Sequence, residues 1–437
     1  MITAGAVITL LLVAVARDSV TNAVLGLVPL IALCVVLALG VQRSATTMVV
    51  VGVFCAPMTG LTLPGGASFV TVSDLLMFLG FGLLIPSLLH TRVQLTWPFL
   101  GGAILLFLTS IVSSLLAADP GTSLNLLIRV MIALVGLPIL FAWWAPRDRV
   151  LTHLAIAYVA GLCFNVVYAV FISGPSPTSA GRYAGLAETP TVLGYSSILA
   201  LSLLPFIWAV IARERRWLVG VAAAVCVYGI WIAGSRTGLV VLAALLLIYP
   251  VIERSVKVAL ALIFLSAVLA ANLGRLTSSD SSNALSRLLG GTGSTQSDDA
   301  RISGLTNALD VFKAHPLFGG GYTFDNFLAH NLYVQVAACA GVIGVGAFLA
   351  LLWGCVAPIF RAERPWGLLA YPALAYVVAG PITPNLGSRY VTVVLGLALI
   401  LNSRDFARES DEPDDTDGPE PVGAITSPGV VTIRGGR

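Results

Sequence analysis

Long apolar stretches, separated by short polar segments, follow one another along most of the chain. Many of them reach about 18 residues or more, the length at which an α-helix can cross the hydrocarbon core of a bilayer. We therefore predict an all-α fold, a polytopic membrane helical bundle of about 12–14 spans. The expected spans cover residues 3–16, 20–41, 45–62, 73–89, 98–117, 124–144, 151–173, 190–212, 217–234, 237–252, 257–273, 331–359, 366–381 and 389–402.

Two segments lack this pattern. The tail 403–437 is rich in acidic residues, glycine and proline, which is typical of disorder, and it is expected to follow a transmembrane domain over 1–402. In the long loop 274–330, apolar residues recur at helical spacing, which predicts an amphipathic helix over 298–314 on the surface of the bundle. Its apolar face is expected to contain Ile302, Leu305, Leu309 and Phe312.

The placement of basic residues predicts the orientation of the bundle. They recur in every second short loop, at Arg43, Arg92, Arg147, Arg149, Arg213, Arg215, Arg216, Arg254, Lys257, Arg361, Arg364, Arg404 and Arg408. Short loops rich in arginine or lysine lie in the cytoplasm. We therefore expect a multi-pass protein of the cell membrane with both termini cytoplasmic. The loops near 64–72, 118–123, 174–189, 274–330 and 381–388 are then external.

Composition narrows the range of functions. The 437 residues are 57% hydrophobic and 10% charged, whereas a soluble domain carries about 25% charged residues. The net charge of +3, without a basic cluster among aromatic residues, does not indicate a nucleic-acid partner. The six cysteines show no metal-ligand spacing, and no P-loop, HExxH or GxSxG motif occurs. The only DxD motif lies in the acidic tail. We expect no metal and no cofactor.

Candidate chemistry clusters on the predicted outer side, where Arg236 stands out. It interrupts the apolar stretch Trp217–Pro250 in the sequence GSRTG, and an arginine so placed needs a partner. A guanidinium group binds phosphate oxygens with paired hydrogen bonds, which favours an anion site. The alternative is an arginine at a helix end that reaches the membrane interface. Arg182, Arg129 and Arg389 are further candidates, each with the alternative of a solvated or interfacial role.

A histidine and a carboxylate are candidates for proton transfer. His330 precedes Asn331, a residue type that caps helices, and the positive end of a helix dipole favours the neutral imidazole that a general base needs. A capping or solvated histidine is the alternative reading. Glu188 is the second candidate, as a base or as a group that orients an arginine. His315, followed by proline, is expected to shape the turn after the amphipathic helix.

Three motifs, in this order, resemble those of the O-antigen ligase and polymerase superfamily. They are RYAGL at 182–186 followed by Thr189-Pro190, GSRTG at 234–238 opening an apolar run, and HPLFGGG at 315–321 followed by HNLY at 330–333 and a glycine-rich apolar span. The resemblance covers residues 180–360, and the first half of the chain matches only as a series of spans. The higher span count and the acidic tail depart from the family pattern.

The resemblance implies a metal-independent, inverting glycosyltransferase whose active site faces outward. The donor would be a glycan on a polyprenyl diphosphate, undecaprenyl or decaprenyl, and the acceptor a second glycan or a glycolipid. The roles carried over are diphosphate contacts for Arg182 and Arg236 and a base or acceptor-positioning role for His330. The other candidate substrate contacts are Arg129, Arg389, Glu188, His315 and Tyr183.

Other functions remain open at this point. A transporter or flippase for the same lipid-linked glycan is the alternative, and a scaffold for envelope assembly is a third possibility. Transporters often show internal repeats and ionisable residues near the midplane of the membrane. Here no repeat is visible and the ionisable residues concentrate toward one face, which favours the enzyme. The sequence does not separate a ligase from a polymerase.

Overall fold

The computed structural model describes residues 40–62, 70–89, 93–176, 181–257, 260, 295–326, 329–383 and 386–411. The predicted span 3–16, nearly all of 20–41, most of 257–273 and the tail beyond residue 411 lie outside these ranges. In the described part, the regular structure is helical, with isolated β-bridges only between Thr62 and Thr71 and between Ser176 and Arg182. The predicted all-α fold is confirmed.

Six helical segments among the described residues are long and apolar enough to cross a membrane, so the chain is a multi-pass membrane protein. They are α5 (Trp97–Leu116), α6 with η1 and α7 (Pro120–Met131, Ile132–Gly136 and Leu137–Trp144), α8 with η2 (Asp148–Tyr168 and Ala169–Ser173), α9 (Pro190–Val210), η4 with α10 (Arg213–Arg215 and Arg216–Ile232), and α16 with α17 (Leu332–Val356 and Pro358–Arg361).

Shorter apolar helices coincide with other predicted spans. They are α3 (Val41–Cys55), α4 (Val72–Leu88), α11 (Arg236–Ile252), η6 with α18 and η7 (Trp366–Ala370, Tyr371–Ala379 and Gly380–Ile382), and α19 (Arg389–Asp411). Two boundaries differ from the predicted ones by more than five residues. α3 ends at Cys55 and a turn follows it, whereas the predicted span ran to residue 62. α19 continues past residue 402 to Asp411.

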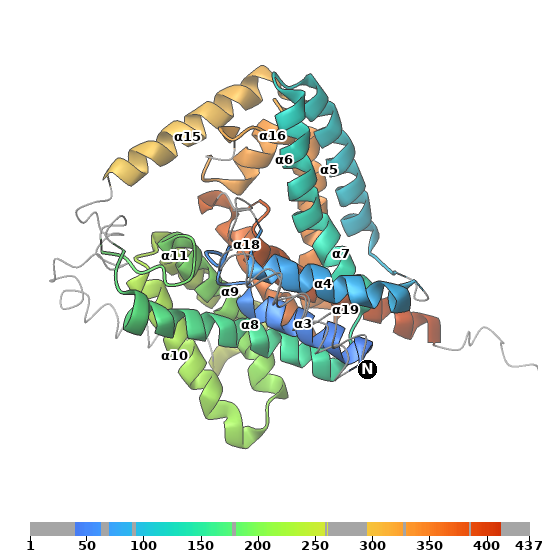
Figure 1. Cartoon of the computed structure of the whole chain (residues 1–437), viewed down its shortest axis with the longest axis vertical. Coiled ribbons are helices and arrows are strands. Elements are labelled where there is room, and N and C mark those ends of the chain that lie inside the picture. Colours follow the sequence, from blue (N-terminus) through green and yellow to red (C-terminus); the bar gives the residue numbers. More distant parts are fainter. Residues whose placement is uncertain are drawn as a thin grey trace, which may run out of the picture.

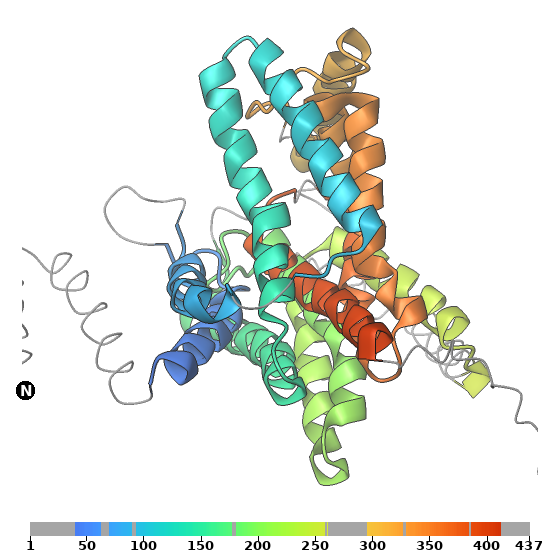
Figure 2. The same cartoon turned by 90° about the vertical axis from the view of Figure 1, so that its right-hand side faces the viewer.

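Small residues let the helices approach closely, as expected where lipid removes most of the hydrophobic driving force between helices. α5 and α16 stand side by side as an upright pair (Figure 2). A Cβ atom built on Gly102 of α5 would lie 2.6 Å from the carbonyl oxygen of Ala347 in α16. About one turn earlier in α5, Phe99 lies against Gly354 of α16. Large apolar side chains such as Phe78 and Trp97 are exposed, as lipid-facing positions require.

α16 breaks at Gly341, a feature that the span predicted over 331–359 did not include. Gly341 has φ 69° and ψ −171°, a backbone conformation open essentially to glycine alone. The chain reverses there, which brings the ring of Tyr333 to 6.5 Å from that of Phe348, centroid to centroid. The loop after α15 packs against the break, where Val342 N–H donates to the Pro316 carbonyl at 2.9 Å.

α15 (Thr295–Ala314) confirms a helix in the long loop. Figure 1 shows it running from the top of α5 and α6 across the molecule toward α11. Ala308 of α15 is buried with Ala329 and Ala338, against Val311 and Val334. Ile302 of the predicted apolar face is 62% exposed, so it does not pack against the described part of the bundle. The contact of α15 with α16 is made by the small Ala308 and not by Ile302.

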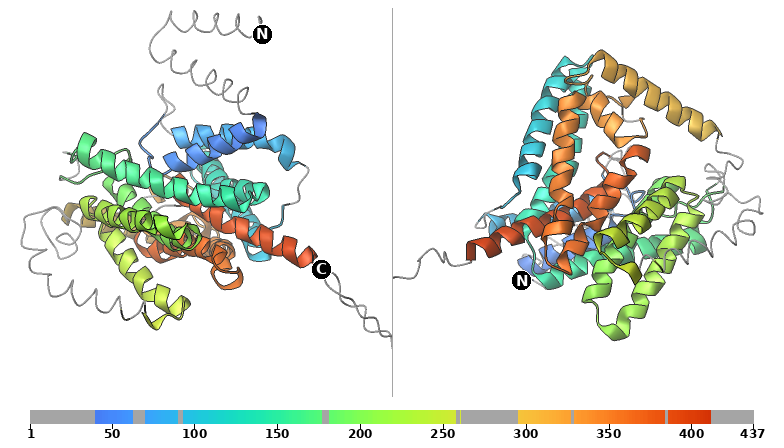
Figure 3. Two further views of the ribbon diagram at one scale, coloured as in Figure 1. Left: turned by 90° about the horizontal axis from the view of Figure 1, so that it is seen from below. Right: turned by 180° about the vertical axis from the view of Figure 1, so that it is seen from behind.

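Two loops of opposite predicted sides lie at opposite ends of the fold. Figure 1 shows α6 beginning at the top of the molecule and α10 beginning at the bottom, and the right-hand view of Figure 3 shows the same separation. Contacts join loops of the same predicted side. Glu253 forms an ion pair with Arg364 at 2.6 Å, and both residues lie in predicted cytoplasmic loops. Tyr322 N–H donates to Ser123 Oγ at 2.8 Å, and both lie in predicted outer loops.

Candidate functional site

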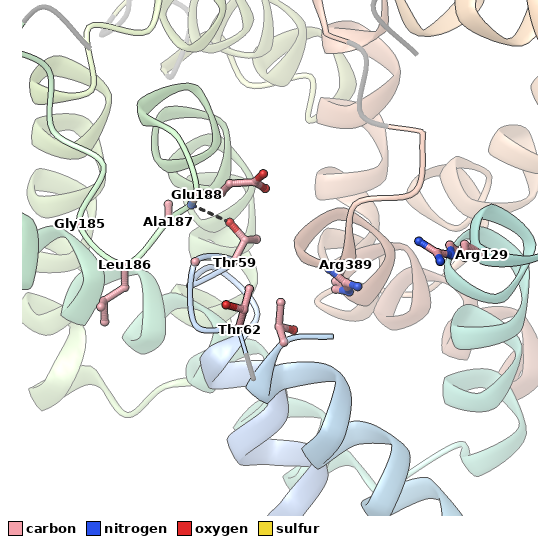
Figure 4. A pocket seen from close by; sticks show the side chains of 10 residues that line it. Thr59, Thr62, Arg129, Gly185, Leu186, Ala187, Glu188 and Arg389 are labelled. Carbon is pink, nitrogen blue, oxygen red and sulfur yellow. Dashed lines mark hydrogen bonds between the residues drawn. The ribbon is translucent and has the colours of Figure 1, made fainter. Parts of the chain in front are cut away.

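A polar cavity of about 580 Å³ lies among loops of the predicted outer group. Figure 4 shows Arg129 and Arg389 on one side, with their guanidinium groups directed into the cavity, and Thr59, Thr62 and Glu188 on the other. The described residues that line it are Thr59, Gly60, Thr62, Thr71, Arg129, Gly185, Leu186, Ala187, Glu188 and Arg389. Three of the substrate contacts predicted from the sequence, Arg129, Arg389 and Glu188, therefore share one space.

The two arginines come from the segment Pro120–Trp144 and from the start of α19. Arg129 lies in the last turn of α6, and Arg389 is the first residue of α19. Arg389 Nε donates to Asp74 Oδ1 at 2.6 Å, and both side chains are about one-third exposed or less (34% and 25%). Asp74 Oδ2 accepts from the N–H and Oγ1 of Thr71, at 2.8 and 2.9 Å, in the capping box that begins α4. The cap of α4 therefore orients the Arg389 guanidinium.

Two loops joined by hydrogen bonds form the opposite wall. Gly60 N–H donates to the Leu186 carbonyl at 2.9 Å, and Glu188 N–H donates to Thr59 Oγ1 at 3.0 Å. The Glu188 side chain itself is exposed, and Figure 4 shows its carboxylate directed into the same space as the arginines. The backbone of the wall is thus fixed while its carboxylate faces the cavity.

Asn165 of α8 ties these two loops together from below. Its Oδ1 accepts from Leu186 N–H at 2.7 Å, and its Nδ2 donates to the Pro57 carbonyl at 3.2 Å. The side chain is fully buried. Gly185, with φ +61°, lets the loop pass over it, because a Cβ there would lie 2.5 Å from Asn165 Oδ1. One buried amide thus sets the position of the wall that carries Glu188.

An apolar groove of about 1020 Å³ meets the polar cavity at the arginines. Arg129 and Arg389 line both spaces, and Asp74 lines the groove. The rest of the groove is mostly aliphatic and aromatic, from α4, α6, the π-helical segment Ile132–Gly136, α7 and residues 386–388. The arrangement places two guanidinium groups, one of them paired with Asp74, between a polar space and an apolar one. It suits an amphipathic anion.

Arg182 contacts the turn that precedes Arg236. Arg182 Nε donates to the Ala233 carbonyl at 2.7 Å, and Tyr183 N–H donates to the Ile232 carbonyl at 3.1 Å. Arg236 begins α11 directly after this turn, and Ser235 is the N-cap of α11. The half-buried Tyr183 packs against the apolar core. Neither arginine is among the described residues that line the cavity, so their role as diphosphate contacts stays a prediction.

His330 lies at the start of α16, beside α15. Asn331 caps α16 as predicted, accepting from the N–H groups of Tyr333 and Val334 at 3.1 Å each. Burial, and then the nearby Arg301 of α15, lower the pKa of His330 and favour its neutral form. His330 is not among the described residues that line the cavity, so its role as a base also stays a prediction.

The exposed His315 shapes the turn after α15, where its carbonyl accepts from Gly319 N–H at 2.9 Å. It is not among the described cavity-lining residues either. Within the described ranges, no group of three or more His, Cys, Asp or Glu side chains is placed to share a metal ion.

Sequence reasoning missed several residues that build the site. Asn165 is the clearest case, and its signal was a lone amide inside an apolar span, where polar side chains often have a specific role. Asp74 was also missed, although a threonine three residues before it forms the sequence pattern of a capping box. Thr59 and Thr62 carried no signal, because hydroxyls in a turn are common.

No family model matches the chain, and no curated protein is similar to it in sequence. Among solved structures, a similar chain comes from a peptidoglycan synthase complex, in work on the structural coordination of polymerization and crosslinking. The alignment covers 72% of this chain and 99% of that chain, with 16% identity and a TM-score of 0.40. A similarity of this degree carries no argument about function, which has to come from the site itself.

Proposed function

We propose that the protein is a membrane glycosyltransferase that takes a glycan from a polyprenyl diphosphate and transfers or polymerises it on the outer face of the membrane. One observation supports this most directly. Arg129 and Arg389 stand where the polar cavity meets the apolar groove. The proposed donor has the same order of parts, with a polar glycan, an anionic diphosphate and a long apolar chain.

The chemistry needs what these residues offer. An acceptor hydroxyl attacks the anomeric carbon of the donor as the polyprenyl diphosphate leaves. The leaving diphosphate is a weak base, so positive charge placed on it does more for the reaction than a general acid. Guanidinium groups bind such oxygens with paired hydrogen bonds. Removing one such preorganised contact raises the barrier by about 3–4 kcal/mol, near 10²–10³ in rate.

The test uses purified protein in detergent with a polyprenyl-diphosphate-linked glycan and an acceptor, and it measures released polyprenyl diphosphate and the glycan product. Release without a membrane gradient separates an enzyme from the competing proposal, a transporter or flippase. We expect Arg129→Ala to lower transfer by about 10²–10³. Arg389→Lys, which keeps the charge but loses the planar fork, should also be impaired.

Arg213→Ala is the matched control, because Arg213 is exposed in η4 at the opposite end of the fold. This variant should retain wild-type activity. Each variant is first checked for insertion and for a single symmetric peak in size-exclusion chromatography. Full transfer by both Arg129→Ala and Arg389→Lys would remove the site assignment, and no transfer by the wild-type protein would remove the proposed function.

A further inference from the structure

The wall that faces the two arginines carries a carboxylate. Among the described residues that line the cavity, Glu188 is the only acidic one, and Arg129 and Arg389 are the only basic ones. Figure 4 shows the Glu188 carboxylate and the two guanidinium groups directed into the same space from different elements. Two guanidinium groups, one of them paired with Asp74, and one carboxylate therefore face a single cavity across its width.

Glu188 is held firmly by its backbone, while its side chain is left accessible. Its N–H donates to Thr59 Oγ1, and the next residue, Thr189, caps α9 by accepting from Val192 N–H at 3.3 Å. On the other side, Ala187 is buried. A carboxylate on a fixed backbone, with its side chain exposed, can meet a substrate without reorganising the loop.

The arrangement of charges determines which side the acceptor enters from. In an inverting displacement, the attacking oxygen approaches the anomeric carbon on the face opposite the leaving group. If the arginines hold the leaving diphosphate, as the proposed function states, the acceptor hydroxyl comes from the wall that carries Glu188. We propose that Glu188 is the catalytic base of this transfer, and this inference rests on the proposed function.

The step balances without any further reactant. The acceptor O–H bond breaks and its proton goes to a carboxylate oxygen of Glu188. The acceptor oxygen forms a bond to the anomeric carbon as the bond from that carbon to the diphosphate oxygen breaks. The electron pair leaves with the polyprenyl diphosphate, whose charge Arg129 and Arg389 stabilise. Proton transfer to a positioned base contributes about 10²–10⁴ in rate.

The experiment compares Glu188→Gln with the wild type in two assays, glycan transfer and thermal stabilisation by added polyprenyl diphosphate. Glutamine keeps the shape of the side chain and removes its basicity. We expect transfer to fall by about 10²–10⁴. Stabilisation by polyprenyl diphosphate should be kept or increased, because a negative charge near the diphosphate is removed. Glu188→Asp, which keeps a base on a shorter side chain, should retain part of the activity.

Asp325→Asn is the matched control, because Asp325 is an exposed carboxylate in the same group of loops and is not among the described residues that line the cavity. It should leave both assays unchanged. Transfer by Glu188→Gln within about threefold of the wild type would overturn the assignment, since a base is worth far more. Loss of stabilisation together with transfer would also overturn it, because Glu188 would then serve binding or folding.

The parallel variant His330→Ala separates the two candidate bases. If it abolishes transfer while Glu188→Gln does not, the base is the histidine and the present inference fails. A wild-type protein that shows no transfer would instead remove the proposed function. The failure of the base assignment and the failure of the proposed function therefore give different results.

Discussion

Among single residues, Asn165 shows how a buried amide can control a site that it does not touch. Its two hydrogen bonds, to Leu186 N–H and to the Pro57 carbonyl, join the loops of one cavity wall. The residue is absent from the described lining of the cavity itself. Its effect on activity must therefore pass through the position of the loop that carries Glu188.

We expect Asn165→Ala to destabilise the protein, because Leu186 N–H and the Pro57 carbonyl would lose their partner. A buried polar group left without one costs about 1–3 kcal/mol. Transfer activity should fall as well, since the wall that carries Glu188 is no longer fixed. Thermal unfolding in detergent and the transfer assay measure the two effects.

Ser202→Ala is the control for this change. The Ser202 hydroxyl is also buried, but it donates only within its own helix, to the Leu199 carbonyl. Its removal should shift stability by about 1 kcal/mol or less. Equal effects of the two substitutions on stability and transfer would show that Asn165 is an ordinary buried polar residue.

Charged residues of the site were predictable from the sequence, whereas their arrangement was not. Arg129, Glu188 and Arg389 were identified because they are ionisable groups at span ends of one predicted side. The sequence ranked Arg182, Arg236 and His330 above them through a family resemblance. Which loops meet depends on contacts between residues far apart in the chain, such as Gly60 with Leu186, and no local pattern contains that information.

Among the elements, the break in α16 has the sharpest conformational requirement. Gly341 adopts a conformation essentially restricted to glycine, and a Cβ there would overlap the Leu317 carbonyl. We expect Gly341→Ala to destabilise the protein by about 1–3 kcal/mol or more, because backbone strain of this kind alone costs about 1–3 kcal/mol. The thermal midpoint in detergent, measured at constant lipid and detergent content, reports the change.

Gly346 provides a control within the same helix. Nothing lies within 4 Å of a Cβ built at this position. Gly346→Ala should therefore be neutral, or stabilising by up to about 1 kcal/mol from helix propensity. If Gly341→Ala were as stable as Gly346→Ala, α16 would not need the break seen between Leu332 and Val356.

Hydropathy located the helices well but did not predict this break. Gly341, Gly344 and Gly346 all lie in one apolar stretch, and the sequence pattern indicated a single glycine-rich span. Glycine in a membrane helix serves close packing as readily as it serves a turn. The break falls at Gly341 and not at the other two glycines because the loop after α15 packs against the chain there. On α15, the sequence pattern did not distinguish the exposed Ile302 from the small Ala308, which makes the contact with α16.

For the whole molecule, the alternation of basic and non-basic loops agrees with the contacts between loops. The pair of Arg364 with Glu253 joins two basic loops, while the cavity gathers loops of the other set. This agreement supports a two-sided protein with the candidate site on one side. The side that faces the cell exterior is a prediction from the positive-inside rule.

Cysteine labelling tests this orientation directly. In a background with the six native cysteines replaced, Gly121→Cys adds a thiol at the exposed start of α6, and Glu214→Cys adds one in the exposed turn before α10. A membrane-impermeant maleimide added to intact spheroplasts should label position 121, and it should label position 214 only after permeabilisation. The reverse pattern would place the cavity on the cytoplasmic side. A transfer reaction at the outer face could not then use Arg129 and Arg389, whatever their effect in detergent, because an impermeable bilayer would separate them from their substrates.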